Sequence, residues 1–350
     1  MTLLLWVPVL LAAVWATHWG AEHLAHPLKK LRRRWGFSVA AGGAFVGLAA
    51  ASPEVGIATT AVLRGVSDIG LGAAIGSNVI AIPIMVVTAY LATRKRQLGG
   101  GDNEGSSDGG EGSDGGGEPQ HAHHEEHVER HTLVVDRQAV TVQALPYLGL
   151  VALFALLTLP EPWRGLQPLD AAFLGTGYLA YAAQALLRGR VEGEDIDWSK
   201  REVALATGGV AALAAGAYFT VRATENIVAG LGIASVVGGL FITAPMATLP
   251  EVFATWSVAR SGQVTPAVTS VIGDHAVTLT LAFVPLALAT LLVENPRLFT
   301  INVVGVALVA ALYAGFVWWD GRERGFTRWQ VATLAAVAPL WAIAVVLWGL

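Results

Sequence analysis

Ten apolar runs, each close to the length that crosses a lipid bilayer, dominate this sequence of 350 residues. A transmembrane helix needs about 20 mostly apolar residues. Only 14% of the residues are charged, whereas about 25% is usual for a soluble protein. We therefore predict an all-α membrane protein with ten transmembrane helices, near residues 2–24, 37–63, 68–92, 144–160, 168–187, 202–226, 230–259, 264–293, 300–318 and 329–349.

Several classes of protein are disfavoured by what the sequence contains. The N-terminal run has no basic residues before it, which favours a first transmembrane helix over a signal peptide. The absence of cysteine excludes disulfides, thiolate catalysis and cysteine-based metal sites. Nothing resembles a phosphate-binding loop, a nucleophile elbow or a nucleic-acid surface. We predict no enzyme activity, no cofactor and no nucleic-acid partner. We expect the protein to be surrounded by the lipid bilayer.

The basic residues predict the orientation of the chain. They follow the odd-numbered runs, so they gather on one side of the membrane, which the positive-inside rule makes cytoplasmic. Both termini would then lie outside a cell (inner or plasma) membrane that the chain crosses many times. The residues that carry this prediction are Lys29, Lys30, Arg32, Arg33, Arg34, Arg94, Lys95, Arg96, Arg188, Arg190, Lys200, Arg201, Arg260, Arg322, Arg324 and Arg328.

One long polar segment divides the chain. Residues 93–143 are rich in Gly, acidic residues and His, and such a composition predicts a disordered cytoplasmic loop. The segment contains a histidine cluster that is either a weak divalent-metal sensor or a solvated linker; its spacing matches no defined ligand geometry. The predicted organisation is an N-terminal half 1–92, this loop, helices in 144–187, a cytoplasmic linker 188–201 and a C-terminal half 202–350. The cluster consists of His121, His123, His124, His127 and His131.

The sequence contains an internal repeat. Residues 52–78 align without a gap to residues 249–275, and each copy has Pro-Glu-Val, a Gly eleven residues after the Glu, and Ile-Gly at 21 and 22 residues after it. The first copy begins in the second run and the second copy in the seventh, which cross the membrane in opposite directions. Two inverted five-helix repeats are typical of secondary transporters, whose substrate sites lie near the midplane on interrupted helices.

Each copy places a proline next to a glutamate inside an apolar run. Pro53 and Pro250 lack a backbone donor, so we expect each to break its helix and free carbonyl groups to face a cation. A carboxylate at the centre of a membrane costs about 2.5–3.5 kcal/mol on insertion scales, so Glu54 and Glu251 predict a functional site. Carboxylates, hydroxyls and carbonyls form a hard-oxygen site that suits Ca²⁺ or Na⁺.

The far end of each repeat supplies further candidates. His275 is either a proton-coupled group or a neutral imidazole that is hydrogen-bonded between helices. Glu22 and Glu225 end equivalent runs of the two halves, where they either gate the pathway or lie in the membrane interface. The predicted ion-binding residues are Glu54, Glu251, Asp274, Ser52, Ser77, Asn78, Thr248 and His275.

The two copies resemble the alpha repeats of the cation/calcium antiporter superfamily, and most closely the sodium/calcium exchanger membrane region. The resemblance is carried by "SPE" at 52–54, "LPE" at 249–251, "IGSN" at 75–78 and "IGDH" at 272–275. It implies alpha repeats at about 37–92 and 230–293, and an ion site between the second, third, seventh and eighth helices. It also implies that Glu54 and Glu251 bind calcium.

The sequence departs from the family pattern at several ligand positions. Three of four expected hydroxyls are replaced by Ala50, Ala51 and Ala247, and the amide or carboxylate expected near the end of each repeat is replaced by Ala81 and Thr278. Asp274 lies one helical turn before Thr278 and preserves the carboxylate count. These changes remove expected sodium ligands and leave room for proton coupling or another divalent ion.

Together these features predict a secondary-active antiporter that exports Ca²⁺ in exchange for Na⁺ by alternating access. We expect its partners to be Ca²⁺, Na⁺ or H⁺ and the lipid bilayer, and its functional form to be a monomer. A proton/calcium exchanger with the same carboxylates is the nearest alternative. A cation channel or a sensor belongs to a different class, and the inverted repeat disfavours it.

Overall fold

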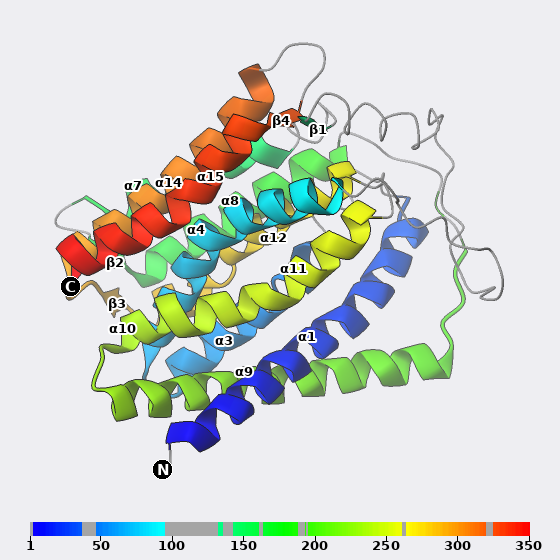
Figure 1. Cartoon of the computed structure of the whole chain (residues 1–350). Coiled ribbons are helices and arrows are strands. Elements are labelled where there is room, and N and C mark those ends of the chain that lie inside the picture. Colours follow the sequence, from blue (N-terminus) through cyan, green and yellow to red (C-terminus); the bar gives the residue numbers. More distant parts are fainter. Residues whose placement is uncertain are drawn as a thin grey trace.

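The computed structural model describes residues 3–36, 47–94, 132–135, 143–160, 164–187, 193, 195–260, 264–319 and 325–350. Figure 1 shows a bundle in which most helices run side by side along the molecule. The helices of the N-terminal half are α1 (Leu3–Arg34), α3 (Ser52–Leu63), α4 (Ser67–Ala92), α7 (Leu145–Thr158) and α8 (Pro168–Leu187).

The C-terminal half begins with α9 (Lys200–Leu231). Its remaining helical segments are α10 (Ser235–Gly238), the π-helical segment η2 (Gly239–Thr243), α11 (Ala244–Arg260), α12 (Val264–Thr278), α13 (Phe283–Leu288), α14 (Pro296–Trp319), α15 (Arg328–Ala344) and the π-helical segment η3 (Val345–Gly349). The described residues also form two short antiparallel pairs of strands, which join β1 (Thr132–Val134) to β4 (Gly325–Thr327) and β2 (Gly165–Leu166) to β3 (Leu291–Leu292).

Helical structure occurs within each of the ten predicted apolar ranges. Among the described residues, seven segments are long and apolar enough to cross a membrane: Leu4–Leu28, Ser67–Ala92, Lys200–Leu231, Ser235–Arg260, Ala267–Leu288, Pro296–Trp318 and Arg328–Gly349. The chain is thus a helical, multi-pass membrane protein. The count of ten crossings and the inverted relation of the two halves stay predictions.

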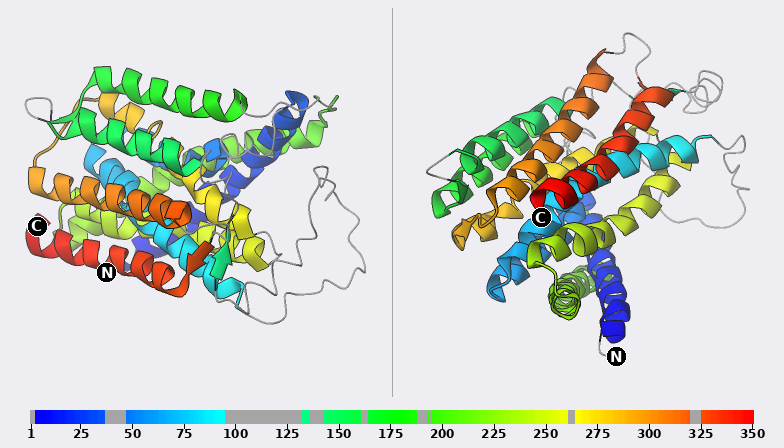
Figure 2. Two further views of the ribbon diagram at one scale, coloured as in Figure 1. Left: turned by 90° about the horizontal axis from the view of Figure 1, so that it is seen from above. Right: turned by 60° about the vertical axis from the view of Figure 1, so that its left-hand side comes forward.

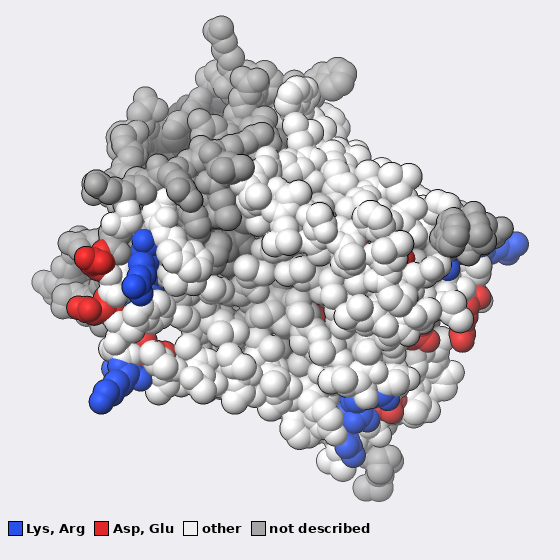
Figure 3. Space-filling model, turned by 180° about the vertical axis from the view of Figure 1, so that it is seen from behind, with Lys and Arg blue, Asp and Glu red and all other residues white. Residues whose placement is uncertain are grey.

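Helix α4 is the centre of the bundle. Within its most apolar window 94% of the residues are buried, compared with 28% for α1 and 22% for α9. It packs against α3, α11, α12, α14 and α15, which come from both halves of the chain. Charged side chains lie mainly at the edges of the face in Figure 3, and most of the surface between them is uncharged, as a membrane-exposed surface requires.

Helices α1 and α9 lie side by side along one edge of the bundle (Figures 1 and 2). Ser199 begins α9 with a capping box in which its hydroxyl accepts from the Glu202 backbone N–H. The carboxylate of Glu202 also forms an ion pair with Lys30 of α1. This ion pair therefore joins the capped start of α9 to the C-terminal part of α1.

The two prolines of the repeats occupy different helical environments. Ala51 forms a turn, after which α3 begins and places Pro53 in its first turn, where a missing N–H is tolerated. The expected break at Pro250 is wrong: α11 runs continuously from Ala244 to Arg260 through this residue. Membrane helices accommodate a proline by local π adjustments, and η2 directly precedes α11.

A short part of the segment predicted to be disordered is ordered. Thr132–Val134 pairs with Gly325–Thr327, so its backbone hydrogen bonds are satisfied by a strand that is distant in the sequence. The five histidines of the predicted metal-sensing cluster lie outside the described residues.

The two halves approach each other closely where α4 passes α10 and η2. A Cβ atom added at Gly72 would meet the backbone of Val236, Leu240 and Gly239. These contacts are to backbone atoms, which cannot rotate away as the end of a flexible side chain can. Glycine at position 72 is therefore required by packing between the repeats.

We predict that Gly72→Ala destabilises the protein by about 1–3 kcal/mol, because overpacking forces the backbone apart. Gly175→Ala on α8 is the matched control, since a Cβ there meets nothing within 4 Å and alanine favours a helix. The measurement is the unfolding temperature of both purified variants in detergent. Equal unfolding temperatures would contradict the packing argument.

Candidate cation-binding site

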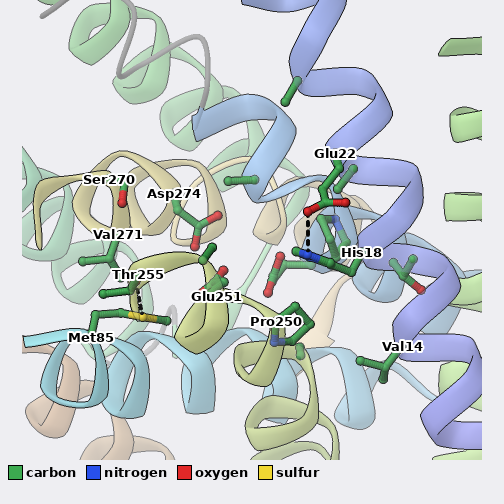
Figure 4. A pocket seen from close by; sticks show the side chains of 18 of the residues that line it. Val14, His18, Glu22, Met85, Pro250, Glu251, Thr255, Ser270, Val271 and Asp274 are labelled. Carbon is green, nitrogen blue, oxygen red and sulfur yellow. Dashed lines mark hydrogen bonds and ion pairs between the residues drawn. The ribbon is translucent and has the colours of Figure 1, made fainter. Parts of the chain in front are cut away.

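A cavity of about 310 Å³ lies between α1, α3, α4, α9, α11 and α12. Glu54, Glu251 and Asp274 all line it. Figure 4 shows Glu251 and Asp274 turned toward the same space, which Glu22 and His18 border from the opposite side. The structure therefore brings together the carboxylates that the sequence predicts.

Each carboxylate is positioned by a different helix. Glu54 lies in the first turn of α3, where the partial positive charge of the helix N-terminus favours an anion. Glu251 follows Pro250 on α11. Asp274 lies on α12, one turn before the end of that helix at Thr278. Residues from both repeats thus face a single cavity.

Two of the carboxylate oxygens lack a hydrogen-bond partner among the described residues. Glu54 Oε2 and Asp274 Oδ1 are buried and have no hydrogen-bond partner there. No Lys or Arg is among the described residues that line the cavity. Burying a charge costs a great deal of free energy unless it is paired or coordinates a metal. The arrangement is therefore chemically suited to cations.

The predicted serine and threonine ligands do not line this cavity. Each hydroxyl instead donates to a backbone carbonyl within its own segment: Ser52 to Ala49 at 2.7 Å, Ser77 to Ala74 at 3.1 Å and Thr248 to Ala244 at 2.9 Å. A hydroxyl forms such local bonds readily in a helix. These side chains lie behind the cavity wall.

Asn78 and His275 also lie behind the wall, where they join helices. Asn78 donates to the Ala74 carbonyl at 2.8 Å and accepts from the Tyr147 hydroxyl at 2.9 Å, which links α4 to α7. His275 Nε2 lies 3.1 Å from the Ser77 carbonyl oxygen and Nδ1 lies 3.2 Å from Asp274 Oδ2. Because a carbonyl only accepts, Nε2 carries the proton of the first contact. The imidazole thus lies between the Ser77 carbonyl of α4 and the Asp274 carboxylate of α12.

The structure adds residues that the sequence analysis did not single out. Thr220 of α9, Thr255 of α11 and Met85 of α4 line the cavity, and Thr255 donates to Met85 Sδ at 2.9 Å. A threonine or methionine in an apolar helix gives no signal of its own in the sequence, because either is common in a packed core.

The two glutamates that end equivalent runs have different surroundings. Glu22 lines the cavity, and one of its oxygens lies 3.2 Å from His18 Nε2. Glu225 is outside the cavity lining and pairs with Arg64 at 2.6 Å, beside the Tyr218 hydroxyl. The hydrogen bond that Arg64 donates to the Glu225 carboxylate raises the pKa of Arg64 above its usual value. One glutamate is therefore accessible in the cavity while the other is held in an ion pair.

We predict that Glu54→Gln raises the unfolding temperature of the protein when chelator is present and cations are scarce, by the equivalent of about 1–3 kcal/mol. The substitution keeps the shape of the side chain and replaces one of the three carboxylates that line the cavity with a neutral amide. Thermal unfolding in detergent at pH 8 measures the effect. Glu22→Gln is the control, because that side chain is 62% exposed and water already solvates its charge. A lower unfolding temperature for Glu54→Gln would contradict the prediction.

Comparison with known proteins agrees with this geometry. The sodium/calcium exchanger protein family matches residues 5–187 and 202–348. The fold matches that of the sodium-calcium exchanger NCX_Mj soaked with 10 mM Na⁺ and zero Ca²⁺, at 19% identity and a TM-score of 0.60 over 99% of both chains. NCX_Mj soaked with 2.5 mM Na⁺ and 10 mM Sr²⁺ gives 19% identity and a TM-score of 0.62 over 99% of both chains. No curated protein sequence has a significant match. The chain belongs to the sodium/calcium exchanger protein family, which consists of membrane transporters.

Proposed function

We propose that this protein is a secondary-active antiporter that exports Ca²⁺ in exchange for Na⁺ by alternating access. The observation that carries the proposal is the convergence of Glu54, Glu251 and Asp274 on one cavity that is lined by no described Lys or Arg. Calcium takes six to eight oxygen ligands at about 2.3–2.6 Å, and carboxylates are its preferred source of charge.

Competition of Na⁺ and Ca²⁺ for the same carboxylates would couple the transport of one ion to that of the other. If Na⁺ and Ca²⁺ both require Glu54 and Glu251, the site holds one kind of ion at a time. A ligand shifts a conformational equilibrium only through its different affinity for the two states. An occupied site would favour reorientation, and an empty site with several buried charges would disfavour it.

The proton-coupled alternative has a specific observation in its favour. Ala50 and Ala247 line the cavity at two positions where the resemblance leads us to expect a hydroxyl ligand for sodium. A methyl group cannot coordinate a cation, so fewer sodium ligands are available. The same carboxylates would then exchange Ca²⁺ for H⁺.

The shape of the cavity supports an inward-facing state. Its lining extends along α1 from Val14 to Ala25 and along α11 from Ala247 to Val258. It therefore reaches toward the end of the bundle where these helices finish at Arg34 and Arg260 (Figure 1). That end carries the basic residues that the positive-inside rule makes cytoplasmic. At the opposite end, the Arg64–Glu225 ion pair joins α3 to α9.

We predict that an outward sodium gradient drives uptake of radioactive calcium into liposomes that contain the purified protein. Glu54→Gln and Glu251→Gln should each reduce the rate at least about tenfold, because a charge-bearing ligand contributes more than about 1.4 kcal/mol. Glu294→Gln, an exposed residue outside this cavity, is the control and should keep the wild-type rate.

A parallel set of liposomes with an outward proton gradient distinguishes the alternatives. Uptake that is driven by protons and unaffected by sodium would replace the sodium proposal with proton/calcium exchange. Calcium flux that requires no opposing gradient would indicate a channel. Full exchange by Glu54→Gln or Glu251→Gln would overturn the assignment of the site.

We predict that Ser270→Cys reacts with a membrane-impermeant maleimide from the cytoplasmic side. Ser270 lines the cavity and is exposed, and the sequence has no native cysteine that would also react. Ala234→Cys, at the exposed start of α10, is the opposite-side control. Labelling in right-side-out and inverted vesicles measures access, and labelling of Ser270→Cys only from outside would contradict the inward-facing assignment.

A further inference from the structure

The hydroxyl of Thr220, on α9, is left without a partner by the described part of the protein. The residue is fully buried and Oγ1 forms no hydrogen bond there. Thr220 lines the same cavity as Glu54 and Asp274, whose unpartnered oxygens are described above. Leaving a buried hydroxyl unsatisfied is unfavourable, so its position beside the cavity points to a partner that the cavity holds.

Other threonines in the protein show that a local partner is normally available. Thr207, also on α9, donates to the Val203 carbonyl at 2.8 Å, and Thr59 of α3 donates to Val55 at 2.7 Å. One turn after Thr220, Thr224 bonds to the hydroxyl of Thr243 at 2.8 Å. A helical threonine usually bonds to the carbonyl four residues earlier. Thr220 therefore differs from these threonines because its hydroxyl has no hydrogen-bond partner among the described residues.

Thr17, at the corresponding position of the N-terminal half, has the local hydrogen bond that Thr220 lacks. Thr17 lies five residues before Glu22 on α1, as Thr220 lies five residues before Glu225 on α9. Both threonines line the cavity, but Thr17 donates to the Ala13 carbonyl at 2.7 Å. Of these two hydroxyls, the one on α9 is unpartnered.

We propose that the Thr220 hydroxyl is a ligand of the transported cation, supplied by α9 in addition to the carboxylates of α3, α11 and α12. This inference rests on the proposed function and extends its binding site to a fourth helix. A hydroxyl adds an oxygen to the coordination shell without adding charge, which offsets the ligands that Ala50 and Ala247 lack. Since α9 carries the ligand, cation binding would favour the conformations in which α9 holds Thr220 against the cavity.

The test compares Thr220→Val, which has nearly the same shape and no hydroxyl, with Thr220→Ser, which retains the hydroxyl. Unfolding temperatures are measured in chelator and then across series of CaCl₂, SrCl₂ and NaCl concentrations. We expect Thr220→Val to unfold at a higher temperature than wild type in chelator, because an unsatisfied polar group is removed. Its apparent calcium affinity should fall by about 5- to 30-fold, the range that 1–2 kcal/mol corresponds to.

Thr220→Ser should retain most of the wild-type affinity, and Thr207→Val, whose hydroxyl is exposed and bonded within its own helix, should leave the affinity unchanged. Wild-type calcium affinity in Thr220→Val would overturn the role of Thr220 while leaving the proposed function intact. A Thr220→Val protein that is less stable than wild type in chelator would also overturn it, because the hydroxyl would then be satisfied within the protein. A wild-type protein that is stabilised by none of the three cations would overturn both proposals.

Discussion

The concentration of negative charge in the middle of an apolar bundle is the constraint on which the rest of the structure depends. Glu54, Glu251 and Asp274 line one cavity, and a carboxylate in such surroundings is expensive unless a positive charge approaches it. A Lys or Arg of the protein would neutralise such carboxylates permanently, whereas a bound cation neutralises them only while it occupies the cavity. No described Lys or Arg lines the cavity, so the proposed function assigns this role to the transported cation.

The helices that present these charges are held by contacts behind the cavity wall. Asn78 joins α4 to Tyr147 of α7, and His275 joins α4 to Asp274. With α4 buried at the centre, one helix contacts elements from both halves of the chain. The polar residues predicted as ligands thus divide into two groups: carboxylates that line the cavity, and side chains that bond to neighbouring helices or to their own backbone.

Much of the fold could be predicted because its determinants are local in the sequence. Apolar length locates the helices, and the repeated Pro-Glu pairs locate the carboxylates, since few other forces would retain Glu54 and Glu251 in apolar runs. The effect of Pro250 could not be predicted in the same way, because π-helical adjustment and packing allow α11 to continue through it. The direction of a hydroxyl also depends on tertiary context, so Ser77 and Thr248 were plausible ligands and Thr220 was not apparent.

Glu22 of α1 and Glu225 of α9 show that the two halves, although similar in sequence, differ in their local contacts. Glu22 and Glu225 end equivalent runs, yet Glu22 borders the cavity and Glu225 is bound to Arg64. The basic partner of Glu225 is not repeated in the sequence. The alignment that pairs Glu54 with Glu251 also pairs Arg64 with Ser261, which has no charge. An ion pair that joins α3 to α9 at one end therefore has no identical counterpart at the other. The two halves share the positions of their carboxylates but differ in the charge at their ends, so the energies of opening the two ends need not be equal. Under the proposed alternating access, such a difference would let the affinity of the bound ion for each state, rather than symmetry alone, determine which end is closed.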